Sequence, residues 1–85
     1  MPQISKFFGI IIKMFYDEHN PPHFHAQYGG DTCCIDIRTL GVMEGYLPPR
    51  VLGLVIEWAI IHKEELENNW RLIEQQQPLN NIAPL

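Results

Sequence analysis

The sequence is poor in the basic residues that mark nucleic-acid-binding proteins. Its 85 residues include only 6 Lys and Arg against 10 Asp and Glu, which gives a formal net charge of −4. No basic cluster is present to neutralise a phosphate backbone, because the few Lys and Arg residues are spread evenly along the chain. The sequence therefore disfavours binding of duplex DNA by this chain alone, and it leaves a transient RNA contact open.

Cysteines and long apolar runs are also scarce. Only two cysteines occur, the adjacent Cys33 and Cys34, and a bridge between them on a strand would be strained. There is no Cys-x-x-Cys pattern, and no apolar stretch reaches the roughly 18 residues that a membrane span needs. We therefore expect a reduced, cytoplasmic protein that does not associate with a membrane.

The composition is nevertheless that of a folded domain. Hydrophobic residues make up 46% and charged residues 19% of the chain, a balance that is typical of globular proteins. A chain of this length forms one domain with a modest core. We expect a single domain over residues 1–85, with a β-rich part at 1–47, a helix at about 49–76 and a C-terminal tail at 77–85.

Glycines and alternating apolar residues predict a β-hairpin in the middle of the chain. The segment Gly29-Gly30-Asp31 separates two alternating stretches, 23–28 and 32–38. The alternation directs one set of side chains towards the core: Phe24, Ala26, Tyr28, Cys33, Ile35 and Ile37.

Two loop lengths are compatible with this alternation, and they differ in register. A two-residue turn would pair His25 with Cys34, whereas a four-residue loop would pair His25 with Asp36. In both registers one polar set lies together on the outward surface of the hairpin: His23, His25, Cys34 and Asp36.

Further strands and a long helix are expected around the hairpin. Residues 4–16 predict strands with a bend at Gly9, and 41–47 predict another short strand. Pro48-Pro49 then begins a helix with an apolar stripe at spacings of three and four: Leu52, Val55, Ala59, His62, Leu66, Trp70 and Ile73. A second stripe completes the core or forms a homodimer interface: Leu54, Trp58, Ile61 and Leu72. The fold class is α+β, a small antiparallel sheet of three to five strands followed by one long C-terminal helix packed on it.

Three of the four histidines lie in one segment, Glu18-His-Asn-Pro-Pro-His-Phe-His25. His-x-His on a strand places two imidazoles on one side, which suits two ligands of one metal ion, and the candidate ligand set is His19, His23 and His25. Imidazole is also the natural acid or base near neutral pH. The candidate catalytic set is therefore His23, His25, Glu18 and Asp36. No cofactor is required by this chemistry, a divalent metal stays open, and an ordinary polar surface is the alternative interpretation.

The chain resembles a known family of small bacterial proteins. The opening Met1-Pro-x-Ile-Ser, the Glu18-His-x-Pro-Pro-His-x-His25 motif and the later Glu64-Glu-Leu…Trp70 are similar to the domain-of-unknown-function family four-one-six-zero. The resemblance covers nearly the whole chain. It implies no settled activity, but genes of the family often lie beside another small uncharacterised family, in an arrangement that resembles toxin–antitoxin pairs. It therefore implies a small cognate protein partner.

Two functions follow from these observations. The first is a toxin-like hydrolase, a metal-independent ribonuclease in which His23 and His25 act as acid and base and Glu18 or Asp36 orients them. The scarcity of Lys and Arg near the motif argues against it, since only Lys13 and Arg38 are near enough in sequence to hold a phosphate. The second is a non-enzymatic, antitoxin-like binding or regulatory module. Its helix surface would bind the partner, and its histidines would be structural or bind a metal.

Overall fold

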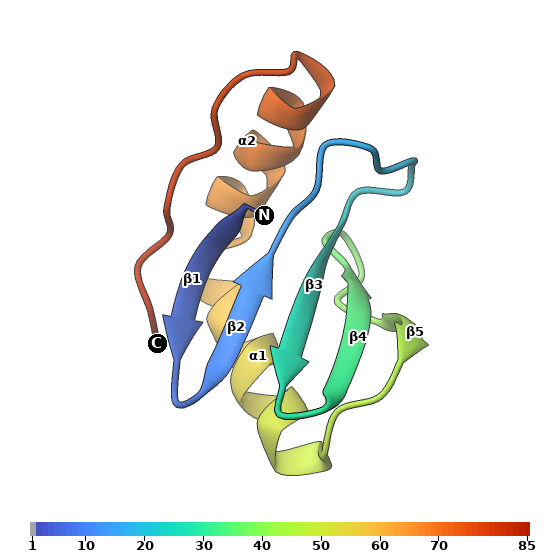
Figure 1. Ribbon diagram of the computed structural model, residues 1–85, viewed down its shortest axis with the longest axis vertical. Helices are drawn as coiled ribbons and strands as arrows, with labels where there is room; N and C mark the ends of the chain where they lie inside the picture. Colours follow the sequence, from blue (N-terminus) through green and yellow to red (C-terminus); the bar gives the residue numbers. More distant parts are fainter. Residues whose placement is uncertain (1) are drawn as a thin grey trace.

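Five antiparallel strands and two helices make up the fold (Figure 1). The structure, a computed structural model, describes residues 2–85, so Met1 of the opening motif lies outside it. The strands are β1 (Gln3–Phe7), β2 (Ile10–Lys13), β3 (His23–Tyr28), β4 (Asp31–Asp36) and β5 (Val42–Gly45), and they neighbour one another in chain order. The helices α1 (Pro49–Ile61) and α2 (Lys63–Glu74) follow. The predicted α+β class is confirmed.

Two tight turns fix the register of β1 with β2 and of β3 with β4. Phe8 and Gly9 both have positive φ, 50° and 78°, the backbone of a two-residue hairpin turn between paired Phe7 and Ile10. The turn at Gly29-Gly30 pairs Tyr28 with Asp31, so the two-residue register is confirmed and the four-residue register is wrong. The inward placement of Tyr28 is also wrong, because its side chain lies at the turn and is 39% exposed.

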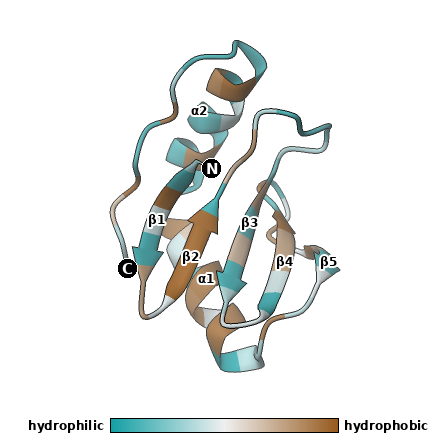
Figure 2. Cartoon of the chain, viewed as in Figure 1, coloured by the Kyte–Doolittle hydropathy of each residue, from teal (hydrophilic) through white to brown (hydrophobic). Residues whose placement is uncertain are grey.

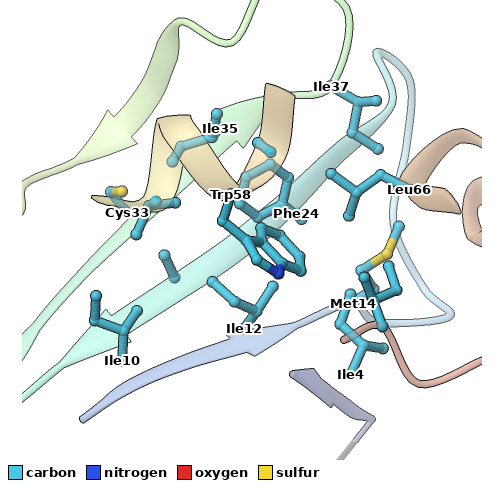
Figure 3. Close-up of a cluster of buried hydrophobic side chains, with 14 of the residues drawn as sticks. Ile4, Ile10, Ile12, Met14, Phe24, Cys33, Ile35, Ile37, Trp58 and Leu66 are labelled. Carbon is cyan, nitrogen blue, oxygen red and sulfur yellow. The ribbon is translucent and has the colours of Figure 1, made fainter. Parts of the chain in front are cut away.

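The core lies between one face of the sheet and α1. Figure 2 shows hydrophobic colouring along β2 and much of α1, whereas the tip of the loop between β2 and β3 is hydrophilic. Trp58 of α1 is fully buried and lies beside Phe24 (Figure 3). Its ring centroid is 5.9 Å from that of Phe24 and 5.5 Å from that of Phe7. Trp58 therefore belongs to the core, and the predicted second stripe is divided, since Ile61 is exposed.

The helical segment is bent, so the prediction of one long helix is wrong. His62 separates α1 from α2 with φ −110° and ψ 25°, outside the α-helical region. The helical hydrogen bonds continue on both sides, from His62 N–H to the Trp58 carbonyl and from Leu66 N–H to the His62 carbonyl. The first apolar stripe is therefore not shifted by the bend, and Val55, Ala59, Leu66, Trp70 and Ile73 are all buried. Sequence spacing alone gives no sign of such a bend.

The last residues pack on the sheet and on α1. Figure 1 shows this segment running beside β1, where the Ile82 N–H donates to the Ile4 carbonyl. Ile82 is buried, and the Trp58 indole N–H donates to the Ala83 carbonyl at 2.8 Å. The tail is thus an integral part of the fold. Within residues 2–85, neither helix has the length and apolar character that a transmembrane span requires.

Candidate functional site

Strand β3 and the loop before it position the functional side chains. His23 and His25 are two residues apart on β3, so alternation places both on the sheet face opposite Phe24, and their ring centroids are 5.4 Å apart. Glu18 comes from the loop between β2 and β3. That loop is fixed at its end because the Ile37 N–H donates to the Pro22 carbonyl. We call Glu18, His23 and His25 the histidine–glutamate cluster.

Both imidazoles direct Nε2 at the same carboxylate. His25 Nε2 contacts Glu18 Oε1, and His23 Nε2 lies 3.4 Å from Glu18 Oε2. One ligand atom from each residue of the cluster lies within 4.8 Å of the other two. Two imidazole nitrogens and one carboxylate at such separations form a group that is able to hold a metal ion.

The other ring nitrogens have their own partners. His23 Nδ1 lies 2.8 Å from the Pro21 carbonyl oxygen, and since a carbonyl only accepts, Nδ1 carries a proton. In a neutral ring this leaves a lone pair on Nε2, facing the negative Glu18 carboxylate. That arrangement is repulsive unless a second proton or a metal cation lies between them. His25 Nδ1 lies 3.2 Å from Cys34 Sγ. In both rings, therefore, the nitrogen that does not face Glu18 has a partner that helps to fix the orientation of the ring.

Burial shapes the electrostatics of the cluster. His23 lies on the predicted outward face of the hairpin, but it is only 7% exposed, and Trp70 of α2 packs on its ring with centroids 5.4 Å apart. His25 is half-buried, with its ring edge-on to Phe15. Burial alone would raise the pKa of Glu18. The hydrogen bond from His25 and the charges of His25 and His23 outweigh that effect and lower the pKa from its ordinary value of 4.5.

Two other predicted residues lie apart from the cluster. Asp36 is the cross-strand neighbour of His23, as the two-residue register requires, but its Oδ1 accepts the N–H groups of Arg38 and Thr39 and so stabilises the turn after β4. His19 is exposed at the rim of the site. Glu18 rather than His19 is the residue that joins the two strand histidines.

Cys34 contacts the cluster through the His25 ring. The register sets it directly opposite His25, which was the available signal, and its thiol contacts the His25 ring. Burial raises the pKa of Cys34, and the negative charges of Glu44 and Glu18 raise it further. The thiol therefore stays protonated at neutral pH, which argues against a nucleophile.

A surface depression lies over the cluster. Its volume is about 340 Å³, and seven residues line it: Glu18, His19, His23, His25, Cys34, Met43 and Glu44. Lys13 of β2 is the direct neighbour of His25 across the sheet, and its Nζ donates to Gln27 Oε1 at 3.0 Å. A small group bound in the depression would meet the cluster and the Glu44 carboxylate, whereas Lys13 is not among the residues that line it.

Comparison with known proteins identifies a family. Residues 9–71, well over half of the chain, match the family described as Domain of unknown function (DUF4160), and this segment includes the whole histidine–glutamate cluster. The chain therefore belongs to that family. No curated protein and no solved structure shows a significant match.

Proposed function

We propose that this DUF4160 member is a metal-dependent hydrolase, whose divalent cation is held by Glu18, His23 and His25. The observation that carries the proposal is the convergence of three ligand atoms within 4.8 Å of one another. A ligand set of two histidines and one carboxylate leaves coordination positions free, as in catalytic zinc sites. A cation with free positions polarises a substrate oxygen and lowers the pKa of a water molecule that it binds.

The contacts favour a ligand role over metal-independent acid–base catalysis. A general acid or base needs a ring nitrogen within reach of the substrate. In His23 and His25 both nitrogens already have partners, and His23 is buried beneath Trp70. The same contacts suit metal ligands, because a ligating imidazole commonly donates its second N–H to a neighbouring acceptor.

The proposed substrate is an RNA phosphodiester, and the proposed setting is a toxin–antitoxin-type pair in the cytoplasm. The cation would provide positive charge for one phosphate, which is sufficient for a transient contact but not for duplex DNA. A small cognate protein partner would inhibit the enzyme by covering the depression. Both cysteines are free, which fits a reducing compartment.

Calorimetric titration of chelator-treated protein with Zn²⁺ and Mn²⁺ tests the metal. We expect about one ion per wild-type chain, and a loss of binding in Glu18→Gln and in His25→Ala, because each removes a ligand. His19→Gln is the matched control, since it changes an exposed histidine at the rim and should leave the affinity unchanged. A wild-type protein that binds neither ion would refute the proposal, and equal loss in His19→Gln would assign a different ligand set.

Cleavage of a single-stranded RNA then tests the activity. Turnover should require the added cation and should be lost in His25→Ala, which removes a ligand of that cation. If the RNA stays intact under conditions in which the cation is bound, the protein binds a metal ion but lacks the proposed ribonuclease activity.

A second candidate, a non-enzymatic partner-binding module, is favoured by one observation. Ile60 and Ile61 at the end of α1 are 63% and 62% exposed, an unusual exposure for adjacent large apolar side chains. Co-expression with the product of the neighbouring gene distinguishes the candidates. In an Ile60→Asp, Ile61→Asp double variant, a binding module loses the partner, whereas an enzyme keeps its RNA cleavage.

A further inference from the structure

We infer that Cys34 is a positioning residue of the proposed metal centre. Its thiol holds the His25 ring in place and accommodates the change of tautomer that metal binding requires. The inference rests on the proposed function, because it concerns the ring that would coordinate the cation through Nε2. It assigns a role to a side chain that does not itself belong to the ligand set.

Backbone pairing fixes the contact. Cys34 of β4 is the direct antiparallel partner of His25 of β3, and Sγ lies 3.2 Å from Nδ1. Cys33, the next residue, is buried on the opposite face of the sheet and belongs to the hydrophobic core. Figure 3 shows Cys33 among the core side chains beneath the helix, so only one of the two adjacent thiols faces the site.

The Nδ1 atoms of the two histidines have different partners. His23 Nδ1 faces the Pro21 carbonyl, which only accepts, so its proton stays on Nδ1 whether or not a cation is bound. His25 Nδ1 faces a thiol, which both donates and accepts. The ring of His25 is therefore free to change its tautomer without losing its partner.

This property matters because the metal-free and metal-bound rings need different tautomers. In the metal-free state His25 donates Nε2–H to Glu18, so a neutral ring accepts the Cys34 S–H at Nδ1. To bind a cation through Nε2, the ring proton has to lie on Nδ1. One ring proton moves from Nε2 to Nδ1 through solvent, the thiol keeps its own proton and rotates, and Nδ1–H then donates to Sγ. No proton is gained or lost in the exchange.

Three variants of Cys34 separate this role from simple packing. Cys34→Val removes the hydrogen bond and retains a side chain suited to a strand. Cys34→Ser retains both donor and acceptor. Cys34→Ala serves as a second hydrogen-bond-free variant in case valine perturbs folding. Thr32→Val on the same strand is the control for the loss of a hydrogen-bonding side-chain group away from the ring.

We expect Cys34→Val to bind Zn²⁺ about 10–100-fold more weakly than wild type, whereas Cys34→Ser should bind nearly as well. A spectroscopic readout accompanies the affinity: long-range ¹H–¹⁵N NMR correlations report which nitrogen of His25 carries the proton. In the wild type the proton should be on Nε2 without zinc and on Nδ1 with zinc. In metal-free Cys34→Val the ring should show a mixture of the two tautomers.

The outcomes distinguish a failure of the role of Cys34 from a failure of the proposed metal centre. If the wild type binds zinc and Cys34→Val and Cys34→Ala bind it equally well with the wild-type tautomers, the role of Cys34 is refuted and the metal centre stands. If Cys34→Ser loses as much affinity as Cys34→Val, packing by sulfur rather than hydrogen bonding is responsible, and the inference is again wrong. If the wild type binds no zinc, the proposed function fails and the inference fails with it.

Discussion

At the scale of single residues, the sequence predicted the members of the cluster better than their partners. His23 and His25 follow directly from alternation on one strand, and Glu18 follows from its place in the same motif. The loop between β2 and β3 determines which acid reaches the rings, and its path does not depend on side-chain alternation. Asp36 was a reasonable alternative because it lies across from His23, but neighbouring backbone N–H groups bind its carboxylate.

The lowered pKa of Glu18 predicts a specific dependence of stability on pH. Because the folded-state pKa lies below the ordinary value of 4.5, ionised Glu18 stabilises the fold above that pH. The contribution is lost as the pH falls below 4.5 and through the folded-state pKa. Urea unfolding should therefore show Glu18→Gln to be less stable than wild type at neutral pH, with the difference shrinking in acid.

A glutamate outside the cluster provides the control for this measurement. Glu57 is exposed on α1, and Glu57→Gln should change the unfolding free energy by no more than about 0.5 kcal/mol at either pH. His23 and His25 lie against Glu18, so the wild type and each variant are compared at the same pH. A difference for Glu18→Gln that grows as the pH falls below 4.5 would contradict the assigned direction.

At the scale of elements, the strands were predictable and the bend in the helix was not. Gly9 and Gly29-Gly30 mark two turns, and alternation permits few registers between them, so strand pairing follows from local pattern. The bend at His62 leaves the stripe intact because the hydrogen bonds continue on both sides of it. Apolar spacing reports which face of a helix is buried, and it contains no information about the direction of its axis.

Two glycines in different elements should respond oppositely to alanine. Gly45 of β5 has φ +86°, and a Cβ built there would lie 2.2 Å from the Thr32 carbonyl oxygen. Gly53 of α1 has open space around the position of a Cβ. Thermal unfolding should show Gly45→Ala destabilised by more than about 2 kcal/mol and Gly53→Ala stabilised by about 0.5–1 kcal/mol. Equal effects at the two positions would show that the approach of β5 to Thr32 is looser than described.

At the scale of the whole molecule, the site is assembled from distant parts of the chain. The β2–β3 loop provides Glu18, β3 provides the histidines, β4 provides Cys34, and α2 covers His23 with Trp70. The bend at His62 sets the direction in which α2 leaves α1, and so where Trp70 lies. Sequence patterns within one element cannot predict such a contact, because it depends on how two elements are oriented in space.

The C-terminal tail offers the last prediction, because it lies beyond the segment that matches the family and yet completes the core. Ile82 is 3% exposed, and its N–H donates to the Ile4 carbonyl of β1. Ile82→Ala should lower the unfolding free energy by about 2–5 kcal/mol, since it removes buried methyl and methylene groups and leaves a cavity. Ile60→Ala is the matched control: the same chemical change at a side chain that is 63% exposed should cost no more than about 0.5 kcal/mol.

Chemical denaturation of wild type, Ile82→Ala and Ile60→Ala measures both differences. If the two variants unfold at the same denaturant concentration, the tail contributes little to the core. If Ile82→Ala unfolds much earlier while Ile60→Ala matches the wild type, this chain depends on a segment outside the family match for its stability.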